Sequence, residues 1–66
     1  MRIKVEKETD TLYFRLDEKN IVESEEIRPG VILDFDKDDK VVGVELLNIS
    51  KLASYTDLTS LQFQTI

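Results

Sequence analysis

The residues best suited to chemistry in this chain are carboxylates that recur at every second position from Asp34. Asp34, Asp36 and Asp38, followed by Glu45, match the spacing D-x-D-x-D-G-x5-E of a calcium-binding loop, whose oxygens surround a hard cation. Asp39 stands where that loop has an invariant glycine, and the flanking segments alternate as strands, whereas such a loop needs helices. The pattern therefore favours a solvated hairpin turn, with weak divalent-cation binding by these four residues as the alternative.

A second acidic group, Glu23, Glu25 and Glu26, offers a carboxylate pair of the kind used in general acid–base catalysis. Alternation along a strand puts Glu23 and Glu25 on one face, about 7 Å apart. A catalytic pair needs one carboxyl group out of water so that its pKa rises, and nothing in this segment indicates a pocket. We expect a charged edge strand that resists aggregation and presents Glu23 and Glu25 to a partner.

Tyr13 and Arg15 share one face of a predicted strand and are the third candidate group. An aromatic ring beside a guanidinium group can stack on a ligand or a nucleic-acid base. The alternative, which we favour, is that Arg15 is a cross-strand neighbour of Glu23 or Glu25 on the polar side of the sheet. In either case Tyr13 and Arg15 are predicted partner-binding residues.

Other chemistries are disfavoured by composition. The chain has no cysteine and no histidine, which excludes disulfides and the usual soft-metal ligands. A serine or threonine nucleophile would need a lysine or carboxylate base, and no serine lies in a recognisable nucleophile elbow. We therefore expect no enzymatic activity and no cofactor, and keep a carboxylate-dependent enzyme as the weakest alternative.

Charge and hydropathy limit the partners. The formal net charge is −5, from 14 acidic and 9 basic residues, which is the wrong sign for phosphate neutralisation, so we expect no nucleic-acid partner. An acidic surface suits a small basic protein instead. No apolar run approaches the roughly 20 residues of a membrane span, and the N-terminal segment alternates as a strand and does not resemble a signal peptide. The expected location is cytoplasmic.

Five strands are predicted around a central hairpin. Pro29–Leu47 reads as two alternating strands joined by the acidic turn, with Gly43 marking a bulge or a close backbone approach. Residues 2–6, 11–16 and 21–28 are three earlier strands, of which the last is the weakest and suits an edge. The fold class is α+β and mainly antiparallel β. We expect a meander sheet of about five strands with a short C-terminal helix.

The last sixteen residues are expected to complete this sheet. Ser50 is placed to cap a short helix over 51–55, and residues 61–66 alternate again as a sixth strand or a segment exchanged between protomers. A single domain of 66 residues buries only about 60% of its unfolded surface, so oligomerisation is an obvious source of further burial. A homodimer or higher oligomer is therefore predicted, with Leu61 and Phe63 as partner contacts.

Three stretches also carry a family resemblance. Residues 9–16 (TDTLYFRL), 24–36 (SEEIRPGVILDFD) and 41–51 (VVGVELLNISK) together resemble the YuzE-like family of small bacterial and archaeal proteins of unknown function. The resemblance covers about residues 1–51 and implies a small β-rich fold without known catalytic residues. It also implies an antitoxin-like role, because such proteins are found beside small toxin-like proteins. The leading prediction is a self-associating, non-enzymatic interaction module, with an antitoxin that binds a small basic toxin as the alternative.

Overall fold

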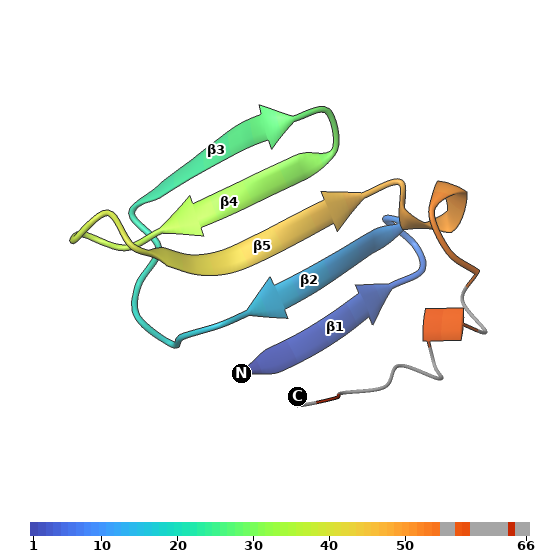
Figure 1. The fold of residues 1–66 in the computed structure, drawn as a ribbon, viewed down its shortest axis with the longest axis horizontal. Coiled ribbons are helices and arrows are strands. Elements are labelled where there is room, and N and C mark those ends of the chain that lie inside the picture. Colours follow the sequence, from blue (N-terminus) through green and yellow to red (C-terminus); the bar gives the residue numbers. More distant parts are fainter. Residues whose placement is uncertain (55–56, 59–63, 65–66) are drawn as a thin grey trace.

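The computed structural model describes residues 1–54, 57–58 and 64, and its central feature is one antiparallel sheet (Figure 1). The elements in chain order are β1 (Arg2–Glu6), β2 (Thr11–Arg15), β3 (Glu23–Arg28), β4 (Val31–Phe35), β5 (Val41–Leu47) and the 3-10 helix η1 (Ile49–Lys51). The predicted hairpin of β4 and β5 is confirmed, and the described residues form the five predicted strands. Within the described residues, no helix is long and apolar enough to cross a membrane.

The strand order differs from the predicted meander. The sheet runs β1-β2-β5-β4-β3, so β5 lies between β2 and β4, and β3 is at the far edge from β1. The connection between β2 and β3 crosses the end of the sheet, where Leu16 N–H donates to Val42 O (2.8 Å) and Val22 N–H to Phe35 O (2.9 Å). The predicted meander was wrong because it needs a tight turn between the second and third strands, whereas this connection reaches the far edge of the sheet. β3, whose six residues are all exposed, takes the predicted edge position.

The register confirms the predicted apolar face. Two rows of side chains cross the sheet from β1 to β4, Ile3–Phe14–Val44–Leu33 and Val5–Leu12–Leu46–Val31. We call these eight residues the open apolar face. The opposite, polar face includes Lys4, Tyr13, Arg15, Ser24, Asp34 and Glu45. Glu23 and Glu25, which were expected on the polar face, pair with Phe35 and Leu33 and so border the apolar face.

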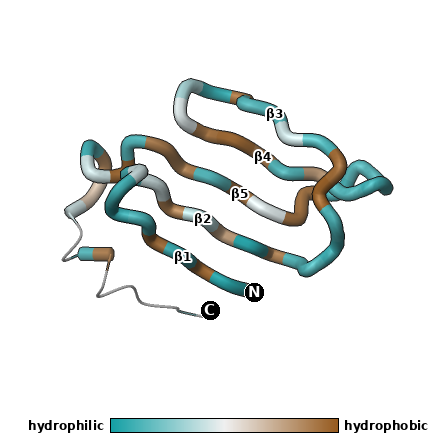
Figure 2. Tube along the Cα trace, turned by 180° about the vertical axis from the view of Figure 1, so that it is seen from behind, coloured by the Kyte–Doolittle hydropathy of each residue, from teal (hydrophilic) through white to brown (hydrophobic). Residues whose placement is uncertain are grey.

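The described core is small because the sheet is a single layer (Figures 1 and 2). Leu12, Val42 and Ile49 are the buried hydrophobic residues of the described part. Ile3 and Val5 on β1 remain 41% and 36% exposed. The closest packing is between neighbouring strands, and no described element covers either face of the sheet. On the open apolar face, Ile3 and Val5 are therefore exposed, Leu12 is buried between its neighbours, and the other five side chains are half-buried.

The C-terminal segment departs from the predicted helix. Ser50 does not cap a helix over 51–55; its N–H and Oγ bind the carboxylate of Asp10, at 3.0 and 2.7 Å. This contact, with Ile49 N–H donating to Asp10 O, fixes η1 against the β1–β2 turn. Ser54 instead caps a helical turn, since its Oγ accepts from Asp57 N–H (3.1 Å). The predicted strand over 61–66 lies outside the described residues except for Gln64, which is not in a strand.

The acidic turn between β4 and β5 is built around Asp36. Its Oδ1 accepts the N–H groups of Asp38 (2.9 Å) and Lys40 (3.0 Å), while its own N–H donates to Lys40 O (2.9 Å). Asp39 has φ 62°, a left-handed conformation that aspartate tolerates better than most residues. The hydrogen bond from Lys40 N–H, followed by that from Asp38 N–H, lowers the pKa of Asp36 below its ordinary value of 3.8. Asp36 therefore serves to close the hairpin.

We expect Asp36→Ala to lower the melting temperature by about 5 °C near neutral pH, because two turn N–H groups lose their acceptor. A carboxylate with a lowered folded-state pKa contributes stability above its unfolded pKa and loses it as pH falls through the folded value. The variant should therefore lose less stability than the wild type in acid below about pH 4. Thermal melts at several pH values measure both effects. Asp38→Ala is the matched control, and an equal loss there would contradict the assignment.

Candidate functional site

The polar face holds a cluster of side chains from four strands, positioned by the sheet register. One row runs Ser24–Asp34–Gly43–Arg15 across β3, β4, β5 and β2. In the neighbouring row Glu45 on β5 lies directly opposite Tyr13 on β2. Because side chains two residues apart on one strand share a face, Glu45 is the diagonal neighbour of Asp34 across Gly43.

Gly43 allows the cluster to form. A Cβ atom at this position would lie 2.9 Å from Asp34 Oδ2 and 3.2 Å from Tyr13 Oη, so both side chains occupy space that any other residue would need. The pairing of β4 with β5 also shifts here, since Asp34 pairs with Gly43 but Phe35 with Val41. The expected bulge at Gly43 is confirmed, and the close approach there is made by the side chains of Asp34 and Tyr13 and not by another backbone.

Asp34 lies under this cluster and is only 1% exposed. Its Oδ1 accepts a 2.6 Å hydrogen bond from Ser24 Oγ. Its Oδ2 is buried, and no hydrogen-bond donor of the described residues is assigned to it. A buried carboxylate oxygen without a donor costs stability, so its surroundings must supply one.

Glu45 is a titratable neighbour of Asp34 on the same face of the sheet. Burial, followed by a hydrogen bond with Asp34 and by the charge of Asp34, raises the pKa of the Glu45 carboxyl group above its ordinary value of 4.5. Glu45 is half-buried and faces the ring of Tyr13 on β2. The two residues therefore form a carboxyl pair in which the second negative charge is disfavoured.

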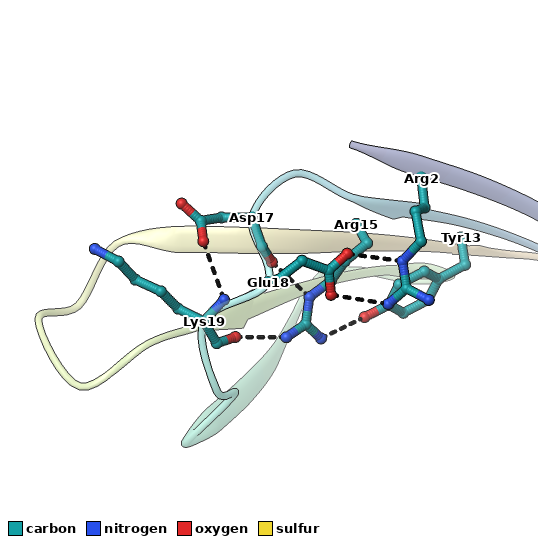
Figure 3. A network of polar contacts seen from close by, with 6 residues as sticks. All are labelled: Arg2, Tyr13, Arg15, Asp17, Glu18 and Lys19. Atoms are coloured by element: carbon teal, nitrogen blue, oxygen red, sulfur yellow. Dashed lines mark hydrogen bonds and ion pairs between the residues drawn. The ribbon is translucent and has the colours of Figure 1, made fainter.

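Arg15 organises the start of the β2–β3 connection (Figure 3). Its Nε donates to Asp17 O (2.6 Å), its Nη2 to Lys19 O and its Nη1 to Tyr13 Oη (3.2 Å). The predicted pairing of Arg15 with Glu23 or Glu25 is wrong, because β5 and β4 separate β2 from β3. Figure 3 shows that the guanidinium group is turned toward the connection, where it holds backbone carbonyl groups.

A groove of about 820 Å³ runs along the polar face over β1, β2 and β5. Its walls include Arg2, Lys4, Glu6, Thr9, Thr11, Tyr13, Arg15, Glu45 and Leu47. The cations are matched by acids nearby, since Arg2 Nε lies 2.8 Å from Glu18 Oε1 and Lys4 Nζ lies 2.8 Å from Glu6 Oε1. Both pairs are well exposed and contribute little stability each. The groove thus offers hydroxyl, guanidinium and carboxyl groups without a strong excess of either charge.

The predicted cation-binding residues are divided between two places. Asp34 and Glu45 meet on the polar face, Asp36 faces the turn backbone and Asp38 lies exposed in the turn. Among the residues that the structure describes, no group of three or more carboxylates could hold a metal ion. Glu45 follows Asp38 at the spacing of a calcium loop. In the sheet, however, Glu45 lies several residues along β5 and away from the turn.

The remaining predicted contacts are placed as follows. Glu23 and Glu25 are exposed on the edge strand β3, and Leu61 and Phe63 lie outside the described residues. Ser24, which binds Asp34, was not predicted as a site residue. Only the β3–β4 register brings the two side chains together, and the alternation of a single strand does not reveal it.

One comparison with known proteins found a match. A family model described as "Protein of unknown function (DUF2283)" matches residues 2–50, from the start of β1 into η1. The matched range agrees with the extent of the resemblance to the YuzE-like family, about residues 1–51, but the description of the family model does not contain that name. No curated protein and no solved structure matches the chain.

Proposed function

Because the chain belongs to the DUF2283 family, whose function is unknown, we propose its role from its own surfaces: it is an interaction module that self-associates through the open apolar face. The observation that carries the proposal is the single-layer sheet. An apolar sheet face is normally covered by a second layer, and the described residues supply none. The charged residues that border this face, Glu23 and Glu25, lie on the edge strand, as expected for the rim of an interface.

Exposure along the first strand supports a second copy as the partner. Ile3 and Val5, which begin the two apolar rows, are 41% and 36% exposed. A stable interface buries roughly 800 Å² on each partner. A second sheet stacked on this face would cover both side chains.

A face-to-face arrangement of two copies also fits the geometry of sheets. Two sheets that pack through their apolar faces form a sandwich with a core about 10 Å thick, in which inner side chains interdigitate. Phe14 and Leu33, which both pair with Val44, would lie near the centre of this layer. Because the same face serves both copies, a two-fold axis closes the assembly as a dimer.

The test compares two neighbouring residues of β4. Leu33 belongs to the open apolar face, while Ile32 is also half-buried but faces the polar side opposite Glu45. We expect Leu33→Lys to weaken self-association about 30-fold or more, because a charge then enters the centre of the interface. Ile32→Lys should leave it nearly unchanged. Sedimentation velocity over a dilution series measures both dissociation constants, and circular dichroism verifies that each variant is folded.

Two results would contradict the proposal. One is a wild-type protein that stays monomeric throughout the dilution series. The other is equal weakening by Leu33→Lys and Ile32→Lys, which would show a general effect of added charge. Deleting residues 61–66 is the complementary variant: if that deletion alone abolishes association while Leu33→Lys does not, the contact lies in the tail and the open apolar face is not the interface.

A further inference from the structure

The inference concerns the buried carboxylate of Asp34, which the proposed self-association does not use. Asp34 is 1% exposed, and Ser24 Oγ supplies a donor to Oδ1 only. Oδ2 points toward the space above Gly43, since it would lie 2.9 Å from a Cβ atom there. A carboxylate oxygen in this position needs a donor from a neighbouring strand.

The groups that face Asp34 come from three strands. β3 contributes Ser24, already bound to Oδ1, and β2 contributes Arg15, which donates to Tyr13 Oη. The Tyr13 hydroxyl makes no hydrogen bond to Asp34 Oδ2 in this structure. β5 contributes Gly43, without a side chain, and Glu45. Glu45 is the diagonal neighbour of Asp34 across Gly43 on the same face, and a carboxyl group donates only when it is protonated.

We propose that Asp34 and Glu45 form a proton-binding pair, in which protonated Glu45 donates to Oδ2 of Asp34 and loss of that proton breaks the β4–β5 contact on the polar face. Asp34 is the acceptor of the pair, because Ser24 already donates to its Oδ1 and its buried Oδ2 has no donor among the described residues. Glu45 is half-buried at the wall of the groove, so its ionised form can turn toward water.

The consequence is a groove whose wall changes with pH. With the proton bound, Glu45 is neutral and held against Asp34. When the proton is lost, Glu45 adds a negative charge to the groove beside Tyr13, and its side chain is no longer held against Asp34. Because the pKa of Glu45 is raised in the folded protein, the protonated pair stabilises the fold. This stabilisation is fully present below the ordinary pKa of 4.5 and is lost as pH rises through the folded-state value. This trend is opposite to that of Asp36, so stability should be greatest in mild acid.

The test replaces the shared proton by a permanent donor. Glu45→Gln keeps the shape of the side chain and can donate N–H to Asp34 at every pH. We expect its melting temperature to exceed that of the wild type by about 4 °C at pH 7 and to equal it at pH 4, when both are compared at one protein concentration. Glu26→Gln, an exposed glutamate on the same face, is the matched control and should differ little from the wild type at either pH.

Carboxyl-carbon NMR shifts give the direct readout. In the wild type, Glu45 should titrate above its ordinary value of 4.5, and Asp34→Asn should lower the Glu45 midpoint toward that value. An ordinary Glu45 midpoint, or a Glu45→Gln variant that is less stable than the wild type at pH 7, would overturn the proposal. If Tyr13→Phe destabilises the protein equally at pH 4 and pH 7 while Glu45→Gln has no effect, the donor is the tyrosine hydroxyl and the proposal is wrong.

Discussion

Replacing Gly43 with valine is expected to abolish the cooperative thermal transition. Its Cβ atom would meet Asp34 Oδ2 at 2.9 Å, Tyr13 Oη at 3.2 Å and Asp34 Cβ at 3.4 Å, and two further methyl groups would enter the same space. Asp34 cannot easily withdraw, because it is buried and held by Ser24. Overpacking of this kind costs about 1–3 kcal/mol or more, which is a large part of the stability of a domain this small.

Alanine at the same position gives a graded test. Gly43→Ala should lower the free energy of unfolding by about 1–3 kcal/mol, and Lys4→Val, which adds a β-branched side chain to an exposed strand position on the same face, by less than about 0.5 kcal/mol. In an Asp34→Ala background, Gly43→Ala should cost less, because the carboxylate it meets is gone. Urea denaturation measures all four variants. Additive costs in the double variant would contradict the close approach.

Truncating the buried leucine of β2 is the second large effect. Leu12 is 6% exposed and pairs with Val5 on β1 and Leu46 on β5. Leu12→Ala should lower the free energy of unfolding by about 2–4 kcal/mol, because it removes apolar contacts and leaves a cavity. For a domain of this size, each kcal/mol corresponds to a fall of about 4–8 °C in melting temperature.

Leu16→Ala is the matched control for this prediction. Leu16 is the same residue type four positions later, yet it lies after the end of β2 and is 42% exposed. Its truncation should cost less than about 1 kcal/mol. Equal losses at Leu12 and Leu16 would mean that the sheet does not pack as described.

The sequence predicted local structure well where that structure depends only on the alternation of side chains within one strand. Alternation identified the apolar face, the β4–β5 hairpin and the acidic turn, because the period of two places every second side chain on one side. It also marked Gly43 and an edge position for the strand rich in glutamate. These inferences depend only on neighbouring residues.

Strand order could not be obtained in this way. The seven residues between Arg15 and Glu23 read equally well as a turn and as a crossover, and only hydrogen bonds from Leu16 and Val22 to distant strands distinguish the two. Because the predicted strand order was wrong, Arg15 was expected to pair with Glu23 or Glu25, which lie on a strand that is not next to its own. The Ser24–Asp34 contact depends on the β3–β4 register, which the alternation of a single strand does not reveal. Asp34, expected on a solvated face, is the most buried carboxylate of the described residues.

The central claim, self-association through the open apolar face, is tested most directly by sedimentation equilibrium of the wild-type chain. We predict a mass of twice 7.7 kDa at micromolar concentration, with dissociation on dilution. We also predict a shift to 7.7 kDa for Leu33→Lys under conditions where Ile32→Lys remains dimeric. A wild-type mass of 7.7 kDa at millimolar concentration would contradict the claim, because the open apolar face would then remain in water without a partner.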